Sequence, residues 1–183
     1  MKNFEIREPV CFHAGWQKAA STTLQLDLFD RHSQIANLGK PTKSLDFYRY
    51  ILRTEAADYD IARCRAIWDE TVAMKVIPGR ALVYSYENIA TSPGIDRSLG
   101  ALRIAELFPE SRVVLVIRNQ FTLLESLFTH LLVTQKIFGT FEQWIRTQLA
   151  GNYNTFIAHA RFYQIWDLYR RLLGEQRVLV LLF

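Results

Sequence analysis

The sequence predicts an α/β fold with three layers, in which a mainly parallel central sheet of about five strands lies between two layers of helices. Two observations lead to this prediction. Short apolar runs alternate with longer segments of helical periodicity along the whole 183-residue chain. One of these runs, at 112–117, is rich in β-branched residues and is typical of a strand covered on both faces. Right-handed crossovers are expected to connect such strands.

Each expected strand is a short apolar run that ends at a turn signal or before a helix. The expected strands are 10–14, 35–39, 81–86, 112–117 and 178–183. The expected helices are 21–32, 46–53, 60–76, 95–108, 121–135, 141–149 and 155–173. The first helix carries Leu24, Leu28 and Phe29 on one stripe. Pro78 and Pro109 end the third and fourth helices.

The composition limits the class of protein. The residues are 50% hydrophobic, and 22 basic against 18 acidic residues give a net charge of +4, which excludes a disordered chain and is compatible with anionic ligands. The length suits a single domain over residues 1–183. Two cysteines, Cys11 and Cys64, are too few for a disulfide framework or a multi-cysteine metal site. Because the sequence shows neither a signal peptide nor a run of about 18 apolar residues, a cytoplasmic protein without a membrane span is expected.

The segment after the first expected strand has the composition of an anion-binding loop. It begins at Gly15, contains Lys18, and ends in three hydroxyl residues, Ser21, Thr22 and Thr23, at a helix start. The N–H groups and the dipole at a helix start bind phosphate, and a lysine adds a mobile charge. The segment is not a Walker A loop, because Lys18 does not directly precede a hydroxyl residue. An ordinary helix cap is the alternative interpretation.

A second polar segment follows the clearest strand. Arg118 comes directly after 112–117, and Ser126 lies eight residues later in the expected helix 121–135. The arginine fork suits two phosphate oxygens. Thr122, Ser126, Thr129 and His130 recur at helical spacing as a polar stripe on an otherwise apolar helix, which favours a polar ligand, with a solvated face as the alternative.

These two segments resemble the motifs of sulfotransferases that use 3′-phosphoadenosine 5′-phosphosulfate (PAPS). The pattern Gly-x-x-Lys-x-x-Ser-Thr-x-Leu is similar to the family's 5′-phosphosulfate loop, and the spacing of Arg118 and Ser126 is that of the family's 3′-phosphate ligands. Ser21 stands where the family has its first threonine and keeps the hydroxyl, and three further positions depart from the family. Ala20 replaces a glycine, which is tolerable only with a negative φ or with room for a methyl group. Gln120 stands in place of the usual proline, and Leu123 in place of a common second basic residue.

The resemblance implies a P-loop-kinase-like fold and transfer of a sulfuryl group from PAPS, as co-substrate, to a hydroxyl or amine of a small-molecule or carbohydrate acceptor. Lys18 is expected to neutralise the charge that develops on the bridging oxygen. The residues expected to bind the co-substrate are Gly15, Ala19, Ala20, Ser21, Thr22, Thr23, Arg118 and Ser126. Neither a metal nor a nucleic acid is expected as a partner, since the sequence carries no ligand cluster.

A general base is needed to deprotonate the acceptor, and Glu87 is the first candidate. It follows the strand 81–86, at the edge of the sheet where ligands bind, and Ser-x-Glu here resembles a segment of bacterial family members. The alternatives are that Glu87 caps the next turn or pairs with Lys18. His32 is the second candidate base, or else a residue that caps its helix.

Other candidates have a functional and a structural interpretation. His13, in the first strand, is expected to be a hydrogen-bonded core residue, and His159 is expected to be structural. His130 could contact the nucleotide or the acceptor, and Trp16 could line the nucleotide pocket or be exposed. Two lysines that could meet an anionic acceptor, or lie in a solvated loop, are Lys40 and Lys43.

Two other functions stay open. One is an NTP-dependent P-loop kinase, although the sequence lacks the Gly-Lys-Ser/Thr motif and an Asp pair for Mg²⁺. The other is a non-catalytic domain that binds a nucleotide or a partner, which Ala20, Gln120 and Leu123 favour. Sulfotransferases that resemble this chain continue past the strand 178–183, so the family's C-terminal part is expected to be absent. A homodimer could then cover that apolar strand.

Overall fold

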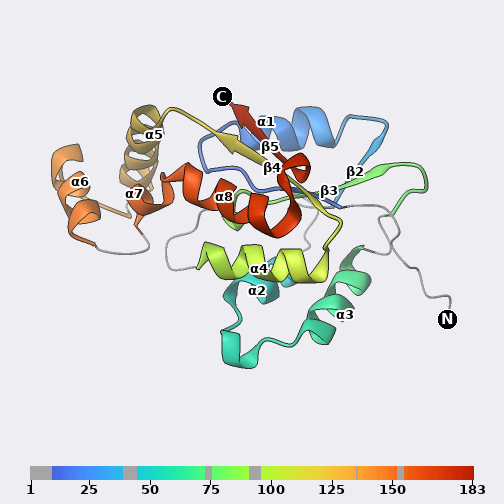
Figure 1. Ribbon diagram of the computed structural model, residues 1–183. Helices are drawn as coiled ribbons and strands as arrows, with labels where there is room; N and C mark the ends of the chain where they lie inside the picture. Colours follow the sequence, from blue (N-terminus) through green and yellow to red (C-terminus); the bar gives the residue numbers. More distant parts are fainter. Residues whose placement is uncertain (1–9, 39–44, 73–75, 91–95, 135, 152–154) are drawn as a thin grey trace.

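The computed structural model describes residues 10–38, 45–72, 76–90, 96–134, 136–151 and 155–183. Five parallel strands form one sheet in the order β2-β3-β1-β4-β5, with helices on both faces (Figure 1). The strands are β1 (Cys11–His13), β2 (Ile35–Asn37), β3 (Ala81–Ser85), β4 (Arg112–Ile117) and β5 (Val178–Leu182). The predicted α/β fold and the predicted parallel sheet are confirmed. Because β1 lies between β3 and β4, the loops that follow these three strands meet at one edge.

The helices form where the sequence has helical periodicity, and side-chain caps set where several of them begin. They are α1 (Ser21–Thr23), α2 (Leu45–Arg53), α3 (Ile61–Val72), α4 (Arg97–Leu107), α5 (Gln120–Val133), α6 (Phe141–Ala150), α7 (Phe156–His159) and α8 (Phe162–Leu173). Short 3-10 turns cover Ala56–Asp58, Glu87–Ile89 and Glu175–Arg177. Four helices begin after a capping residue whose side chain accepts a hydrogen bond from a backbone N–H of the first turn. The capping residues of α4, α5, α6 and α7 are Asp96, Asn119, Thr140 and Thr155, respectively.

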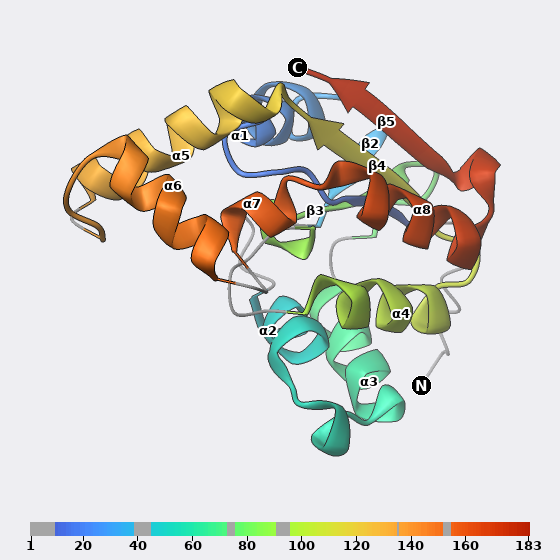
Figure 2. The same ribbon diagram turned by 60° about the vertical axis from the view of Figure 1, so that its left-hand side comes forward.

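The helices are divided between the two faces of the sheet. The helix that begins with α1 covers one face, whereas α4 and α8 cover the other, where α2 and α3 pack against α4 (Figures 1 and 2). Helix α8 contacts both β4 and β5. Helices α5 and α6 pack against each other and extend past the sheet on the side where β4 ends (Figure 2).

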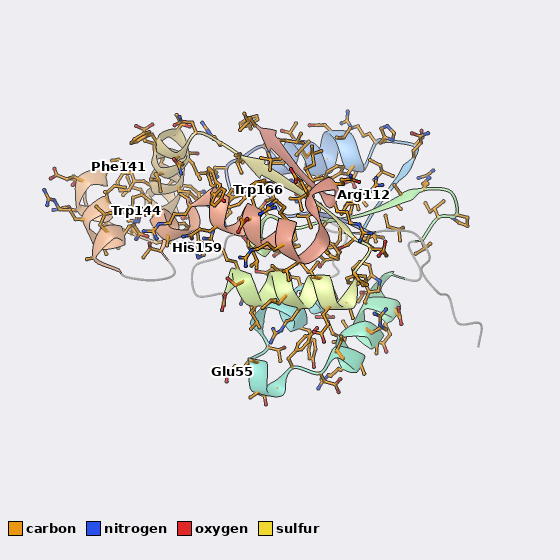
Figure 3. All side chains as sticks on the ribbon, in the orientation of Figure 1. Glu55, Arg112, Phe141, Trp144, His159 and Trp166 are labelled. Atoms are coloured by element: carbon orange, nitrogen blue, oxygen red, sulfur yellow. The ribbon has the colours of Figure 1, made fainter. Side chains whose placement is uncertain are left out.

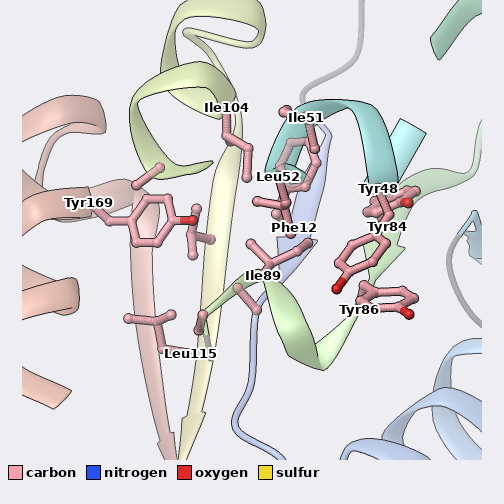
Figure 4. Close-up of a cluster of buried hydrophobic side chains, with 14 of the residues drawn as sticks. Phe12, Tyr48, Ile51, Leu52, Tyr84, Tyr86, Ile89, Ile104, Leu115 and Tyr169 are labelled. Atoms are coloured by element: carbon pink, nitrogen blue, oxygen red, sulfur yellow. The ribbon is translucent and has the colours of Figure 1, made fainter. Parts of the chain in front are cut away.

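An aromatic cluster joins α2 and α3 to the centre of the sheet. The ring centroids of Phe47 in α2 and Trp68 in α3 are 4.7 Å apart, and Phe47 is 5.2 Å from Tyr84 of β3. Phe12 of β1 lies 5.3 Å from Phe108, which ends α4. Phe12, Phe47, Trp68 and Tyr84 are almost completely buried, and burying each such side chain stabilises the fold by roughly 1.5–3 kcal/mol. Figure 4 shows Phe12 and Tyr84 facing the side chains of α2.

The predicted stripe of the first helix is correct for Leu24, which packs against the core, and for Phe29, which is buried, but it is wrong for Leu28. Residues Leu24–Phe29 form a π-helical stretch, in which the N–H of Asp30 donates to the carbonyl of Gln25. Gln25 and Phe29 are therefore buried, while Leu28 is 43% exposed. The prediction assumes α-helical spacing, whereas the π-helix has a wider turn, and Gln25 faces inward and bonds to Ser85.

The predicted helix 155–173 is also wrong, because the chain breaks it into α7 and α8. The N–H of Phe162 donates to the carbonyl of Ala160 in the break, instead of to a carbonyl four residues earlier. Side chains of two other helices, α4 and α5, donate hydrogen bonds to the backbone carbonyls in the break. Arg97 donates to the carbonyl of His159 at 3.0 Å, and Gln120 donates to that of Ala160 at 2.7 Å.

The ends of some predicted elements differ from the structure or cannot be compared. The predicted helix 60–76 is described as Ile61–Val72, and residues 73–75 lie outside the described residues, as does Gly39 at the end of the predicted strand 35–39. At the other side of the sheet, β5 pairs with β4 and exposes Leu179, Leu181, Leu182 and Phe183. Its cover by a second subunit stays a prediction.

Candidate functional site

The loop between β1 and α1 is held in place by hydrogen bonds to β4 and to itself. The N–H groups of Ala14 and Trp16 donate to the carbonyls of Val114 (3.0 Å) and Val116 (3.2 Å), so the parallel pairing continues past β1. The Trp16 carbonyl then accepts from the Ala19 N–H and from the Ser21 hydroxyl, both at 3.2 Å. The loop is therefore closed around one carbonyl oxygen.

The conformation of Ala20 is left-handed. Its φ is 55° and its ψ is 17°, so the condition of a negative φ is not met. The residue is half-buried, and its methyl group is accommodated. A left-handed conformation costs a non-glycine residue roughly 1–2 kcal/mol. The loop thus keeps the backbone that suits the family's glycine, at a cost in stability.

Arg118 joins the two polar segments that the sequence singles out. Its Nη1 donates a 3.0 Å hydrogen bond to the carbonyl oxygen of Lys18, and its Nε donates to the Thr122 hydroxyl at 3.1 Å. Ser126 lies one turn beyond Thr122 on α5 and is half-buried. The structure therefore brings the loop after β1 and the start of α5 into direct contact.

The hydroxyl groups and the lysine of the loop differ in exposure. Ser21 is buried, and its hydroxyl is used inside the loop, whereas Thr22, Thr23 and Lys18 are exposed. Ala19 is completely buried and contributes its backbone alone. The loop carries these exposed donors and also contacts Arg118 through the carbonyl of Lys18, a combination that is suited to an anion.

Glu87 is the first residue of the turn that follows β3, and it is half-buried. Its neighbour Asn88 accepts a 2.7 Å hydrogen bond from Nε2 of Gln17, which belongs to the loop after β1. The segment that carries Glu87 therefore adjoins the loop that carries Lys18. Its role as a base stays a prediction.

Two histidines are structural, as the sequence predicts. His13 is completely buried, its Nδ1 lies 2.7 Å from the Ser85 hydroxyl, and burial lowers its pKa to about 4. His159 is buried in α7, where burial, together with the charge of Arg97, lowers its pKa to about 4.

The other two histidines lie on exposed or half-exposed positions. His32 is exposed, and its Nδ1 accepts from the N–H of Gln34, so it caps a turn. His130 lies on α5, where desolvation and the charges of Lys18 and Lys136 lower its pKa. Its place near Lys18 keeps the predicted contact with a ligand open. The predicted lysines Lys40 and Lys43 lie outside the described residues.

Trp16 is not exposed, which corrects one of its two interpretations. It is 2% exposed, its Nε1 donates to the His159 carbonyl at 2.9 Å, and its ring lies 4.6 Å from that of Phe162. It lines a small, mostly enclosed apolar cavity together with Leu123 and Leu127 of α5. Trp16 thus connects the loop to α7 through this hydrogen bond and to α8 through the ring contact.

Sequence reasoning missed a buried polar group beneath the loop. Gln25 donates to the Ser85 hydroxyl at 3.0 Å, and the same hydroxyl contacts His13. The spacing of Ser21, Gln25 and Phe29, four residues apart, could have indicated that one face of the helix carries polar groups into the sheet. Among the described residues, no group of histidine, cysteine or acidic side chains could hold a metal ion.

The comparisons with known proteins support the fold. No protein-family model and no curated protein matches the sequence. A solved crystal structure, that of a sulfotransferase from Alicyclobacillus acidocaldarius, matches with a TM-score of 0.69 and 16% identity, over 97% of this chain and 74% of that chain. None of the helices described is long and apolar enough to cross a membrane. The chain therefore has a sulfotransferase-like α/β fold.

Proposed function

We propose that this chain binds PAPS across the two segments that Arg118 joins, and that it transfers the sulfuryl group to a hydroxyl or amine of an acceptor. The observation that carries the proposal is the 3.0 Å hydrogen bond from Arg118 to the carbonyl of Lys18. This contact places a forked cation beside a loop with the composition of a phosphate cradle. The likeness in fold to a sulfotransferase supports the same reaction.

The residues of the loop fit a doubly phosphorylated nucleotide. The backbone N–H groups of Lys18 and Ala20 donate no hydrogen bond within the described part of the chain. A Cβ at Gly15 would lie 2.9 Å from His13 Nε2, so the loop needs glycine there to pack. The backbone N–H groups of Lys18 and Ala20, together with the exposed hydroxyls of Thr22 and Thr23, would hold the 5′-phosphate.

Arg118 and Ser126 would hold the 3′-phosphate. The two departures next to them have structural roles in this chain. Leu123 is 1% exposed and packs in the core, so it does not reach the ligand. Gln120 donates to the carbonyl of Ala160 and helps to hold the break between α7 and α8. The guanidinium of Arg118 would therefore supply most of the binding of the 3′-phosphate.

In the proposed reaction, Glu87 accepts the proton of the acceptor as its oxygen or nitrogen forms a bond to sulfur. Lys18 stabilises the electron pair that the broken sulfur–oxygen bond leaves on the 5′-phosphate. The loop and Arg118 fix the two phosphates, so that the attacking and leaving atoms lie in line.

A second candidate function is nucleotide binding without transfer. It is favoured by the loop itself, because the Ser21 hydroxyl is already bonded to Trp16 and Ala20 is strained. The two functions differ in one measurement, since both predict binding and only the first predicts turnover of PAPS.

Thermal unfolding with added nucleotides tests the proposal. Adenosine 3′,5′-bisphosphate at about 100 times its Kd should stabilise the protein by roughly 2.7 kcal/mol and raise its Tm by several degrees. ATP with Mg²⁺ at the same concentration should have a smaller effect. Stabilisation by ATP with Mg²⁺ alone would contradict the proposal in favour of a kinase. Stabilisation by the bisphosphate without transfer from PAPS to any acceptor would support the non-catalytic function.

A further inference from the structure

The loop after β1 contains a tight turn over residues 16–19. The N–H of Ala19 donates to the carbonyl of Trp16 at 3.2 Å, so Gln17 and Lys18 are the two central residues of a β-turn. The φ of Lys18 is 63°, whereas Gln17 has no positive φ. A positive φ at the second central residue alone is characteristic of a type II turn, and this position favours glycine or asparagine. A lysine there is strained.

The type of this turn decides where the N–H of Lys18 points. Types I and II differ by a rotation of the peptide group between the two central residues, which is here the peptide that joins Gln17 to Lys18. A lysine by itself favours type I, in which its φ is negative. That rotation would reverse the direction of the Lys18 N–H, which is one of the backbone donors proposed for the 5′-phosphate. Contacts with other segments therefore have to stabilise type II.

Two hydrogen bonds from distant segments flank this peptide. On one side, Nε2 of Gln17 donates to Oδ1 of Asn88 at 2.7 Å, between half-buried side chains that are 71 residues apart. On the other side, the carbonyl of Lys18 accepts from Arg118. The side chain of Lys18 is exposed, so its own packing does not hold the turn. Arg118 already belongs to the proposed 3′-phosphate site, whereas the amide pair of Gln17 and Asn88 has no role there.

Asn88 is a fixed partner for Gln17. It lies in the turn Glu87–Ile89, in which the N–H of Ile89 donates to the carbonyl of Tyr86 at 3.1 Å. Ile89 is 2% exposed and belongs to the buried cluster (Figure 4). The N–H of Tyr86 donates to the carbonyl of His13 at 3.1 Å. The core and β1 therefore hold the segment that carries Asn88, independently of the loop.

We propose that Gln17 and Asn88 are positioning residues, whose hydrogen bond holds Lys18 in the left-handed conformation that directs its N–H at the 5′-phosphate. The inference rests on the proposed function and adds two residues that act through Lys18 rather than on the ligand. Without the bond, the turn populates type I, and the apparent Kd rises as the binding-competent fraction falls. Because Gln17 precedes Lys18 and Asn88 follows Glu87, the same bond joins the segments of both proposed catalytic residues.

Titration calorimetry with two nucleotides tests this role, because adenosine 3′-monophosphate lacks the 5′-phosphate that the loop would hold. Gln17→Ala and Asn88→Ala should each raise the Kd of adenosine 3′,5′-bisphosphate about fivefold and that of the 3′-monophosphate less than twofold. The double variant should stay near fivefold, since both changes remove the same bond. The exchanged pair, Gln17→Asn with Asn88→Gln, keeps the combined length of the side chains and should return the Kd to within about twofold of wild type.

Two variants of Lys18 separate the conformation of the turn from other effects of the bond. Lys18→Gly removes the cost of a positive φ, so Gln17→Ala should raise the Kd of the bisphosphate less than about twofold in this background. Lys18→Ala is the matched control, because it removes the same charge and retains that cost. In the Lys18→Ala background, Gln17→Ala should again raise the Kd about fivefold.

A merely structural role for the amide pair predicts other results. It would lower the Tm of Gln17→Ala and leave the Kd values unchanged, or it would give equal effects in the Lys18→Gly and Lys18→Ala backgrounds, and either result overturns the inference. An equal rise in Kd for both nucleotides also overturns it. The proposed function stands in these cases if wild-type protein binds the bisphosphate more tightly than the 3′-monophosphate. Equal Kd values in wild type, or no binding, would contradict the proposed function and the inference together.

Discussion

The guanidinium of Arg118 donates a hydrogen bond of 3.0 Å to the carbonyl oxygen of Lys18, across 100 residues of sequence. The two residues follow adjacent parallel strands, β4 and β1, whose carboxyl ends share one edge of the sheet. Both partners are also held by other hydrogen bonds. Arg118 donates to the Thr122 hydroxyl, and the loop that contains Lys18 is closed by the bond from the Ala19 N–H to the Trp16 carbonyl. A phosphate placed there would meet an arginine that is already oriented.

The shape of the arginine fork should matter more than its charge. Arg118→Lys keeps the charge but loses the second donor, so we expect the Kd of adenosine 3′,5′-bisphosphate to rise about tenfold. The matched control is Arg112→Lys, at the exposed first residue of β4, which is the opposite end of the strand that Arg118 follows (Figure 3). This control should change the Kd less than twofold. Equal Kd values for the two variants would contradict the role of Arg118.

Replacement of Ala20 by glycine should stabilise the protein. Glycine removes a left-handed cost of roughly 1–2 kcal/mol and loses about 0.4–1 kcal/mol through the entropy of the unfolded chain, so a net gain of about 0.5–1 kcal/mol is expected. Urea unfolding measures it. The control, Ala66→Gly on the exposed face of α3, should instead destabilise by about 1 kcal/mol. A loss of stability in Ala20→Gly similar to that of Ala66→Gly would contradict the strain at position 20.

Acid should destabilise the protein through its buried histidines. Burial lowers the pKa of His13 and of His159 to about 4, from about 6.5 in the unfolded chain. The unfolded state therefore binds more protons between pH 6.5 and pH 4, and the free energy of unfolding should fall through this window as the pH drops. Each histidine contributes about 2–3 kcal/mol between pH 7 and pH 4.5.

The His13→Gln variant isolates one of these two contributions. The difference in unfolding free energy between pH 7 and pH 4.5, measured in urea, should shrink by about 2 kcal/mol relative to wild type. The carboxyl groups titrate in both proteins, so their effect cancels in this comparison. An unchanged pH difference in the variant would show that His13 is not the neutral, buried group described.

Glu87→Gln should reduce transfer without reducing nucleotide binding. Loss of a general base lowers the rate by about 10²–10⁴-fold, whereas the Kd of the bisphosphate should stay within twofold because the proposed role of Glu87 is toward the acceptor and not toward the phosphates. Single-turnover transfer from PAPS measures the rate. Glu125→Gln, on the exposed part of α5, is the control and should keep the wild-type rate. A wild-type rate in Glu87→Gln would assign the base to another residue.

Much of the fold follows from local patterns. The strands are apolar runs with clear ends, and the run at 112–117 is an element with the same bounds in the structure. The π-helical stretch and the break between α7 and α8 do not follow from local patterns. Gln25 turns inward because Ser85, 60 residues away, offers it a partner. The break at Ala160 contains neither proline nor glycine and is held by Arg97 and Gln120 from other elements.

The contact between the polar segments was predictable, but the support beneath them was not. Lys18 and Arg118 follow strands that a parallel sheet brings together, so their proximity follows from topology. The partners of His13 depend on the register of β1 against β3, where His13 stands opposite Ser85. A single sequence does not encode that register in any visible pattern, and so the buried polar group beneath the loop appears only in three dimensions.

The most direct test of the central claim compares two nucleotides that differ in one phosphate. Titration calorimetry should give a Kd for adenosine 3′,5′-bisphosphate at least tenfold lower than that for adenosine 5′-monophosphate, because Arg118 and Ser126 bind the additional group. In Arg118→Ala, the two Kd values should approach each other. Equal Kd values in the wild-type protein, or a preference that Arg118→Ala leaves unchanged, would contradict the claim that the two segments form one PAPS site.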